Sequence, residues 1–302
     1  MFHVERMEQL QSCPACGQST LKPYLTCIDY TVSKKEFKID VCTACTFKFT
    51  NPRPTASEIG YYYDSPDYIS HSNSRKGLVN LVYQLVRQIS LNRKIKLVKS
   101  LNLEGKQVLD IGSGTGEFLK KTQDAGFDVI GIEPNSKARD YAIKNHKLKI
   151  YQEFDLDSIP PASKDLITMW HVLEHVHLLQ DRIKQIKTIL KPNGYAIIAV
   201  PNYTSWDAKH YGVIWASYDV PRHLYHFSPL VMKQLFHRNK MEHVRSLPLR
   251  YDSYYVSLLS SKYKKETFPL FKAVKNGFRS NRLAKGNPEL FSSVIYVFKN
   301  VI

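Results

Sequence analysis

The sequence predicts an α/β protein with a doubly wound, mostly parallel sheet and a small cysteine-rich module in front of it. First, largely apolar runs of strand length alternate with helical stretches, as in buried parallel strands joined by helices; they cover 108–111, 129–132, 166–170 and 195–200. Second, a glycine-dense turn follows the first of these runs. Third, all five cysteines lie within residues 1–60.

Composition limits the class of protein. The chain has 302 residues, of which 43% are hydrophobic, enough for one large domain and a small one. Its purely apolar stretches, such as 196–200, are far shorter than the roughly 20 residues that span a bilayer. Residues 1–10 contain no apolar core of a secretory signal. We therefore expect a cytoplasmic protein, with peripheral contact to the inner membrane as the alternative.

The net charge of +16 favours anionic partners, because a large positive charge attracts them from a distance. Nucleic acid, an anionic membrane face and a phosphorylated small molecule all fit this charge. A lysine-rich proteome would produce the same value, so charge alone identifies no partner.

Two C-x-x-C pairs, Cys13–Cys16 and Cys42–Cys45, are separated by 25 residues. Cysteines in the cytoplasm stay reduced, and two such pairs complete a tetrahedral zinc site with no open position. The predicted metal is therefore structural Zn²⁺ bound by Cys13, Cys16, Cys42 and Cys45. A redox role is the alternative, but the pairs lack a thioredoxin-like βαβ context. Cys27 is interpreted as a buried filler.

Residues 61–104 begin with three tyrosines and continue into a predicted helix. Apolar residues recur there at helical spacing: Leu78, Leu81, Val82, Leu85, Val86 and Ile89. Residues 71–103 include no acid but several bases: Arg75, Lys76, Arg87, Arg93, Lys94, Lys96 and Lys99. Such a helix lies on an anionic membrane or packs on the catalytic domain as a lid. A second basic run covers 262–285.

The glycine-dense turn occupies 112–116, between the strand at 108–111 and the start of a helix. Glycine lets a ligand approach the backbone closely. Glu133 ends the next strand, 21 residues after Gly112, where an acid can accept both ribose hydroxyls. A tight strand–helix turn without a ligand is the alternative.

Two details indicate which nucleoside the turn binds. The spacing is G-x-G-x-G, whereas dinucleotide sites have G-x-G-x-x-G. Asp110 directly precedes the turn, where a carboxylate would repel a pyrophosphate and attract the cationic methionine end of S-adenosylmethionine (SAM). The pattern therefore favours SAM over NAD.

Residues 105–300 resemble class I SAM-dependent methyltransferases, through the motif 110–116 and the ribose acid Glu133. The resemblance implies a seven-stranded Rossmann-like sheet whose last, antiparallel strand comes from about 292–298. It also places Asp155 near the adenine. The residues predicted to bind the cofactor are Asp110, Gly112, Ser113, Gly114, Gly116, Glu133, Asp155 and Trp170.

The segment 171–175 reads H-x-x-E-H and follows the strand at 165–170. It is similar to the E-x-x-E-H segment of ubiquinone-pathway O-methyltransferases, which is associated with a divalent metal, but His171 replaces the first acid. An inverted zinc-peptidase motif fits poorly directly after a parallel strand. Either Glu174 and His175 anchor a helix start, or His171, with a typical pKa of about 6.5, acts as a general base.

The loop 206–228 is rich in His, Tyr, Arg and Trp and suits a polar substrate pocket. Its segment P-R-H-L-Y-H-F-S, at 221–228, resembles a motif in methyltransferases of surface-glycan or lipid-linked pathways. Arg222 suits a phosphate or carboxylate, and His223 is a second candidate base. The alternative is an aromatic surface loop that packs on its own helix. The predicted catalytic set is His171, His175, His223 and Arg222.

The arrangement C-x-x-C-G, then C-x-x-C, then N-P-R-P at 51–54 and a tyrosine-rich stretch at 61–68 resembles the N-terminal zinc domain of sugar C-methyltransferases. We find no counterpart of their long C-terminal domain in these 302 residues and therefore do not expect their chemistry to carry over. We divide the chain into a zinc ribbon (1–60), a helical lid or linker (61–104) and a methyltransferase domain (105–302).

The sequence thus predicts a SAM-dependent methyltransferase for a small-molecule, glycan or lipid-linked acceptor, expected to be anionic, with O-methylation through a histidine base. A nucleic-acid methyltransferase is one alternative, but no N-P-P-[YF] motif follows the strand at 165–170. A non-catalytic zinc-ribbon and Rossmann binding protein is the other.

Overall fold

A computed structural model describes residues 6–64 and 78–301, with side chains from residue 84 onward in the second range. Its centre is a seven-stranded sheet with the order β12-β13-β10-β9-β6-β7-β8. The strands are β6 (Gln107–Ile111), β7 (Asp128–Ile132), β8 (Ile150–Tyr151), β9 (Lys164–Trp170), β10 (Leu190–Pro201), β12 (Met241–Pro248) and β13 (Ser293–Asn300). Strands β10, β9, β6, β7 and β8 are parallel, whereas β13 is antiparallel to both neighbours. The predicted fold class is confirmed.

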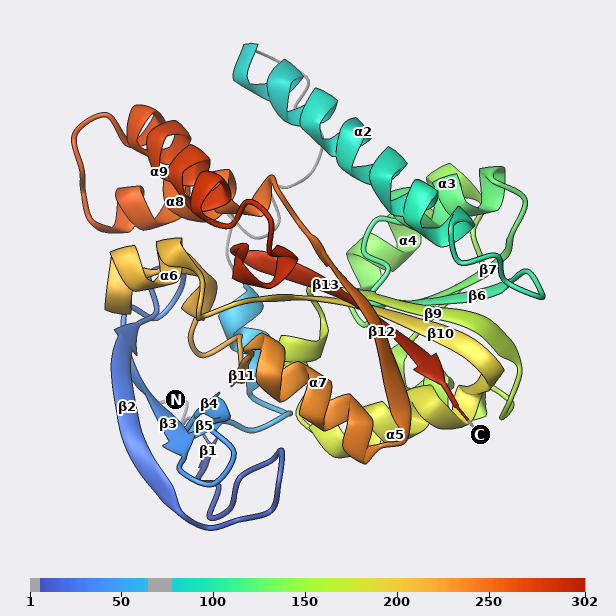
Figure 1. Cartoon of the computed structure of the whole chain (residues 1–302), viewed down its shortest axis with the longest axis horizontal. Helices are drawn as coiled ribbons and strands as arrows, with labels where there is room; N and C mark the ends of the chain where they lie inside the picture. Colours follow the sequence, from blue (N-terminus) through green and yellow to red (C-terminus); the bar gives the residue numbers. More distant parts are fainter. Residues whose placement is uncertain (1–5, 65–77, 302) are drawn as a thin grey trace, which may run out of the picture.

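Helices cover both faces of this sheet (Figure 1). One face carries α2 (Leu78–Lys99), α3 (Glu117–Asp124) and α4 (Ser136–His146), and the other carries α5 (Leu179–Ile189) and α7 (Pro229–Arg238). Two separate apolar cores result, one on each side of the sheet. Helix α7 begins at Pro229, because the Ser228 side chain accepts the Val231 N–H as an N-cap and Pro229 suits the first turn.

The N-terminal segment forms a smaller antiparallel sheet, in which β2 (Leu21–Ile28), β3 (Glu36–Cys42) and β4 (Lys48–Thr50) are joined by β11 (Tyr225–His226). A further pair of strands, β1 (Met7–Glu8) and β5 (Arg53–Pro54), lies beside it. Strand β11 belongs to the C-terminal half of the chain. The N-terminal segment and the large domain therefore contribute strands to the same sheet. The boundary predicted at residue 60 is therefore crossed by backbone hydrogen bonds, and the three-part division stays a prediction.

The remaining elements surround the end of the large sheet at which β6 and β9 terminate. The α-helices are α6 (Trp206–Tyr211), α8 (Asp252–Tyr263) and α9 (Pro269–Leu283). The 3-10 turns are η1 (Ile59–Tyr63), η2 (Glu153–Ser158), η3 (Leu173–His175), η4 (Gly212–Ile214), η5 (Ala216–Tyr218) and η6 (Pro288–Leu290). Helices α8 and α9 form a hairpin inserted between the paired strands β12 and β13 (Figure 1).

Helix α2 packs through its second half. Leu91, Leu97 and Val98 are buried, whereas Leu85, part of the predicted apolar stripe, is 60% exposed. Its bases contact the protein: Arg87 pairs with Glu117, and the Arg93 and Lys94 side chains lie over the rings of Tyr251 and Trp170. These contacts favour the lid interpretation. The predicted basic residues Arg75 and Lys76 lie outside the described residues.

Candidate cofactor and acceptor site

The glycine turn adopts a conformation that requires glycine. Gly112, Gly114 and Gly116 all have positive φ, at 74°, 56° and 84°. A Cβ on Gly112 would lie 2.3 Å from Cγ2 of Val172, so this glycine lets the loop after β9 pack on the turn. A Cβ on Gly114 would meet nothing within 4 Å. The backbone of Gly114 is therefore open to a ligand.

Glu133 lies beside this turn, as the strand-end argument predicts. Its carboxylate accepts the N–H of Gly114 at 2.7 Å and the N–H of Asn135 at 2.9 Å. Burial raises the pKa of Glu133, and these two hydrogen bonds oppose that effect. The fold thus brings together the ribose acid and the glycine turn, which lie on adjacent parallel strands.

Asp110 is 2% exposed and accepts a hydrogen bond of 2.5 Å from the Thr168 hydroxyl. Burial raises the pKa of Asp110 to about 7, although Thr168 and Lys94 act in the opposite direction. Lys94 comes from α2, and its Nζ lies 4.0 Å from the centre of the Trp170 ring. Burial lowers the pKa of Lys94 to about 8, against the attraction of Asp110 and Asp252.

Sequence reasoning did not assign Lys94 to this site. It stands in a run of similar bases, and nothing in the pattern distinguishes it from Lys96 or Lys99. Its position beside Asp110 depends on how α2 packs on the sheet.

Two buried polar atoms at the site are compatible with a bound nucleoside. Within the described part of the chain, Ser113 Oγ and Trp170 Nε1 are buried and have no hydrogen-bond partner. Such a group costs about 1–3 kcal/mol, which a ligand atom can offset. Asp155 is half-buried and accepts the N–H of Gln152 at 2.9 Å in η2. Its adenine contact stays a prediction.

His171 is held between two carboxylates. Its Nδ1 lies 3.3 Å from Glu174 Oε1, and its Nε2 lies 2.8 Å from Asp252 Oδ2 at the start of α8. Burial alone lowers the pKa of His171, but Asp252 and Glu174 together raise it to about 10. A protonated imidazole cannot accept a proton. The geometry therefore argues against our expectation that His171 is the general base.

Glu174, His175 and His223 form a cluster that the sequence did not predict as a unit. One side-chain donor atom from each lies within 4.8 Å of the other two. His175 Nδ1 is 3.0 Å from the carbonyl oxygen of Arg222 and 2.9 Å from the Tyr63 hydroxyl, and His223 Nδ1 is 2.9 Å from the carbonyl oxygen of Ser217. If each Nδ1 carries the proton, each Nε2 is left to bind a ligand.

The charges of this cluster suit a cation. Burial, reinforced by nearby His223, lowers the pKa of His175 to about 4, so this ring is neutral at pH 7. Glu174 is completely buried, and among the described residues its Oε2 has no hydrogen-bond partner. Two imidazole nitrogens and a carboxylate are a common ligand set for divalent metals.

Arg222 lies in a buried ion-pair network. Its side chain is 1% exposed, its Nη1 donates to the carbonyl of Tyr62, and its Nη2 donates to Asp29 and Asp219. The Nε also donates to Asp219. Because every guanidinium nitrogen is engaged, this geometry argues against the predicted contact between Arg222 and an anionic acceptor.

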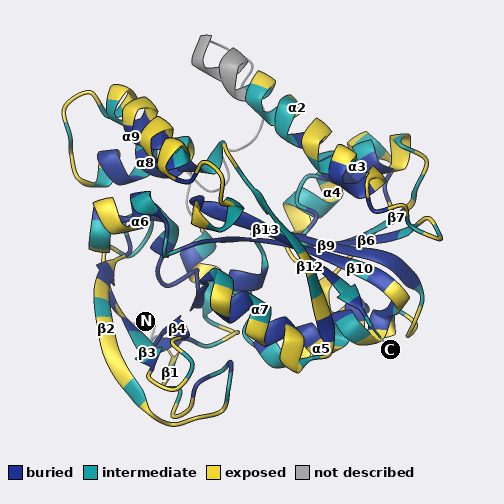
Figure 2. Cartoon of the chain, in the orientation of Figure 1, coloured by how far each residue is buried: buried dark blue, intermediate teal, exposed yellow. Residues whose placement is uncertain are grey.

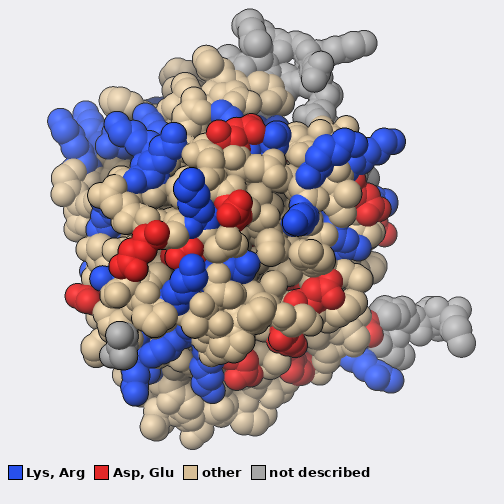
Figure 3. All heavy atoms as spheres, turned by 90° about the vertical axis from the view of Figure 1, so that its right-hand side faces the viewer, with Lys and Arg blue, Asp and Glu red and all other residues tan. Residues whose placement is uncertain are grey.

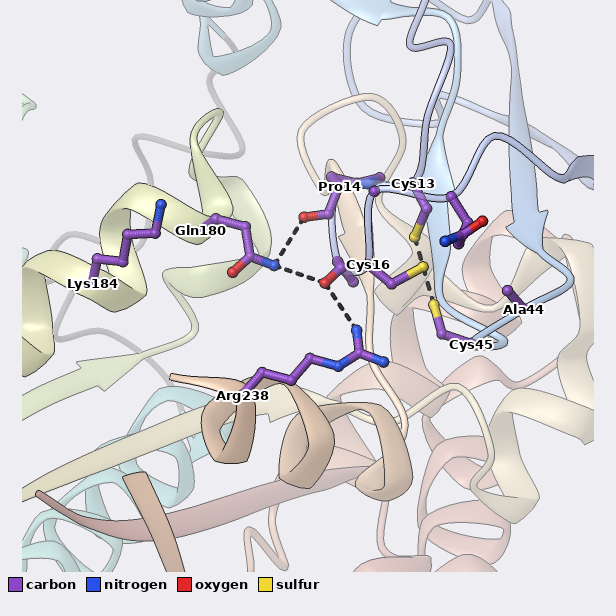
Figure 4. A pocket seen from close by; sticks show the side chains of 11 residues that line it. Cys13, Pro14, Cys16, Ala44, Cys45, Gln180, Lys184 and Arg238 are labelled. Atoms are coloured by element: carbon purple, nitrogen blue, oxygen red, sulfur yellow. Dashed lines mark hydrogen bonds between the residues drawn. The ribbon is translucent and has the colours of Figure 1, made fainter. Parts of the chain in front are cut away.

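The four predicted zinc ligands converge, and Figure 4 shows Cys13, Cys16 and Cys45 of this cluster. Cys13 Sγ lies 3.6 Å from Cys45 Sγ, and the Cys16 and Cys42 Sγ atoms are also 3.6 Å apart. A zinc tetrahedron with Zn–S bonds of about 2.3 Å has edges of about 3.8 Å. The cluster therefore has the dimensions of a Cys₄ zinc site. Cys27 is buried elsewhere, in the core of the small sheet.

The first cysteine pair is attached to the large domain by hydrogen bonds (Figure 4). Gln180 on α5 donates to the carbonyls of Pro14, at 3.2 Å, and Ala15, at 2.8 Å. Arg238 on α7 donates to the same Ala15 carbonyl at 3.1 Å. The position of the cysteine pair therefore depends on two helices that cover the sheet.

Comparison with solved structures defines the class of fold. The structure of phosphoethanolamine N-methyltransferase 2 from Haemonchus contortus, solved with SAM, has a TM-score of 0.53 and 13% identity, covering 84% of this chain and 63% of that one. A SAM-dependent methyltransferase from Archaeoglobus fulgidus has a TM-score of 0.50 and 20% identity, covering 74% of this chain and 100% of that one. The fold is that of class I SAM-dependent methyltransferases.

Residues 84–245, more than half of the chain, match the methyltransferase domain family. The chain belongs to this family of SAM-dependent enzymes. It is 30% identical over 139 residues to a ubiquinone biosynthesis O-methyltransferase from Bradyrhizobium diazoefficiens, covering 44% of this chain and 54% of that one. A protein of the same description from Rhodopseudomonas palustris is 28% identical over the same length and coverage. The chain spans about half of the length of these curated relatives.

Proposed function

We propose that the protein transfers the methyl group of SAM to a hydroxyl oxygen of a small-molecule or lipid-linked acceptor. The observation that carries the proposal is the cluster of Glu174, His175 and His223. Glu174 and His175 directly follow β9, at the same sheet edge as the glycine turn, and His223 comes from the loop between η5 and β11. Support also comes from the similarity to ubiquinone biosynthesis O-methyltransferases.

The proposed cofactor site consists of the turn 112–116, Glu133 and Asp110. SAM supplies an electrophilic methyl group on a sulfonium sulfur, so the protein needs mainly to position the acceptor and exclude water. Glu133 would bind the ribose, and Asp110 would attract the cationic end of the cofactor. Lys94, from α2, lies over the Trp170 ring, so these two side chains would cover the cofactor on the side of α2.

We assign the proton-handling role to the cluster rather than to His171. Glu174, His175 and His223 would together hold a divalent cation, which would lower the pKa of an acceptor hydroxyl as a Lewis acid. His171 would position Glu174, since it pairs with Oε1 and leaves Oε2 for a ligand. In this arrangement His223 takes the place left by the missing first acid of the E-x-x-E-H pattern.

We further propose that Cys13, Cys16, Cys42 and Cys45 hold a structural zinc ion. The sulfur separations support this assignment, and so does a site with four protein ligands. The ion would stabilise the turns that Gln180 and Arg238 contact.

The test combines cofactor binding with methyl transfer. We expect SAM and S-adenosylhomocysteine to bind with one site per chain in isothermal titration calorimetry. Label from methyl-labelled SAM should pass to catechol or hydroxyquinone acceptors, including prenylated ones, and transfer should fall on chelation and return with added Mg²⁺, Mn²⁺ or Co²⁺.

Variants distinguish the cofactor site from the cluster. His175→Asn and His223→Asn should each reduce transfer by about 100-fold or more, as expected for loss of acid–base assistance, with SAM affinity changed less than about threefold. Exposed His237 on α7 provides the control His237→Asn, which should behave as the wild type. A folded protein that binds no SAM would overturn the proposal. Full transfer by both cluster variants would overturn the role of the cluster alone.

A further inference from the structure

Helix α9 of the α8–α9 hairpin places its polar and apolar side chains on the opposite faces from an ordinary surface helix. A surface helix usually turns its apolar stripe toward the protein and its charges toward water. The part of α9 that faces the protein is small and polar, with Ala273, Asn276, Gly277 and Ser280 buried. Large apolar side chains occupy the opposite part.

Polar side chains on the inner face of α9 form hydrogen bonds with the rest of the protein. The Ser280 hydroxyl donates to Asp207 at 2.7 Å, and the Asn276 amide donates to the Tyr211 hydroxyl at 2.8 Å. Gly277 allows close packing on α8, because a Cβ there would lie 2.6 Å from the Tyr254 ring. The orientation of α9 is therefore set by specific contacts, and its apolar side chains are left outside.

The outer face exposes a continuous apolar stripe. Phe271, Val274 and Phe278, spaced by three and four residues, are 68%, 55% and 58% exposed. Leu270 and Phe268 extend the stripe to the start of the helix, at 55% and 75% exposed. The exposed outer surface of α9 is visible in Figure 2. A contiguous patch of this kind indicates an interaction site.

Positive charge flanks this stripe. Helix α9 carries Lys272, Lys275, Arg279 and Arg282 and no acidic residue. On the face of the molecule in Figure 3, by contrast, acidic and basic side chains are interspersed. Arg279 also lies over the Trp206 ring, at 4.9 Å from its centre. Lys275 and Arg282 are exposed to solvent.

We propose that the outer face of α9 binds the surface of an anionic phospholipid bilayer. The aromatic and aliphatic stripe would enter the boundary between headgroups and acyl chains, and the flanking bases would contact headgroup phosphates. The helix lies in the plane of the interface in this arrangement. Among the described residues no helix has both the length and the apolar character needed to cross a membrane.

Charge argues for a bilayer rather than a second copy of the chain as the occupant. Two copies joined through α9 would place four bases of each helix near four bases of the other, with no acid in either helix to compensate them. An anionic lipid surface satisfies both the apolar stripe and its basic flank.

The hairpin also connects this surface with the proposed acceptor site. Helix α8 starts at Asp252, whose carboxylate pairs with His171 at 2.8 Å. A protein docked through α9 would therefore hold its acceptor site near the bilayer, where a lipid-linked acceptor is concentrated. This last step rests on the proposed function, whereas binding to the bilayer does not.

Vesicle co-sedimentation tests the surface. We expect the wild type to sediment with vesicles of phosphatidylcholine containing phosphatidylglycerol, to ignore pure phosphatidylcholine, and to lose binding at high salt. The double variant Phe271→Ser/Phe278→Ser and the double variant Lys275→Glu/Arg282→Glu should each reduce binding by about tenfold or more.

Matched controls change equivalent side chains elsewhere. Leu178 and Leu230 are exposed at 67% and 56%, so Leu178→Ser/Leu230→Ser removes similar exposed apolar surface. Lys22→Glu/Lys38→Glu makes the same change in net charge on the small sheet. Both controls should bind vesicles as the wild type does.

Three outcomes would overturn the inference: no binding of the wild type to anionic vesicles, full binding by both α9 variants, or equal losses in the controls. A dimer detected by analytical ultracentrifugation and abolished by Phe271→Ser/Phe278→Ser would assign the surface to a second copy instead. SAM affinity, measured on the same proteins, should be unchanged. Failure of SAM binding with intact vesicle binding would sink the proposed function and leave this inference standing.

Discussion

Arg222 and Asp29 form a buried ion pair, with Nη2 and Oδ1 3.0 Å apart and side-chain exposures of 1% and 0%. Asp29 follows β2 of the small sheet, and Arg222 precedes β11, the strand that the large domain contributes to that sheet. The pair therefore joins the two parts of the chain at the point where they share a sheet.

Removing the arginine charge should destabilise the whole protein. Arg222→Met leaves the buried carboxylate of Asp29 and the half-buried carboxylate of Asp219 without their cation. Loss of one member of a buried ion pair typically costs about 3–5 kcal/mol. Urea unfolding measures this change. Arg222→Met/Asp29→Asn should recover part of the lost stability. If Arg222→Lys instead preserved stability and raised only the KM for the acceptor, Arg222 would belong to the substrate site after all.

Loss of the cysteine cluster should unfold the small sheet. Cys16→Ser should abolish the one equivalent of zinc expected by metal analysis and lower the denaturation midpoint, because a structural metal contributes folding free energy. Cys27→Ala is the matched control, since Cys27 lies outside the cluster and should leave the zinc content unchanged. A Cys16→Ser protein that kept both metal and stability would contradict the zinc assignment.

Gln180→Ala should separate docking from metal binding. The variant loses the hydrogen bonds to the Pro14 and Ala15 carbonyls but none of the four sulfur ligands. We expect full zinc content and a loss of stability of about 1–2 kcal/mol, measured by urea unfolding. Loss of zinc from this variant would show that the docking contacts are needed to form the site.

Asp110 should make both stability and SAM affinity depend on pH. Burial raises its pKa to about 7 in the folded protein, whereas an unfolded chain has a value of about 3.9. The folded state therefore retains the proton longer, so the stability from Asp110 is complete below about pH 4 and is lost as pH rises through about 7. SAM affinity should change in the opposite direction, because the cationic end of SAM needs the ionised carboxylate.

Asp110→Asn tests both effects. Its stability should vary less between pH 5 and 8, and its melting temperature at pH 8 should equal or exceed that of the wild type. Its SAM affinity at pH 8 should fall by about tenfold, the loss of one charge-assisted contact. Asp140→Asn, at an exposed position on α4, is the control. Unchanged SAM affinity in Asp110→Asn would exclude a role for this carboxylate.

The sequence by itself determined the features that depend on local chemistry and strand order. The turn 112–116 needs glycine because its backbone takes positive φ. Glu133 lies next to this turn because the carboxyl ends of neighbouring parallel strands meet at one edge of the sheet. The paired cysteines follow the same logic, since C-x-x-C spacing brings two sulfur atoms together at one turn.

Only the tertiary structure decided which side chains the site makes available. His171 was predicted to be a base because an isolated imidazole titrates near neutrality. In the structure it pairs with Asp252, which lies 81 residues later in the chain and raises the pKa of His171. Arg222 was predicted to bind an anionic acceptor, but in the structure its guanidinium group pairs with Asp29 and Asp219. Charge, burial and partner choice depend on neighbours distant in sequence, and the same holds for the outward stripe of α9, whose spacing alone does not say which face meets the protein.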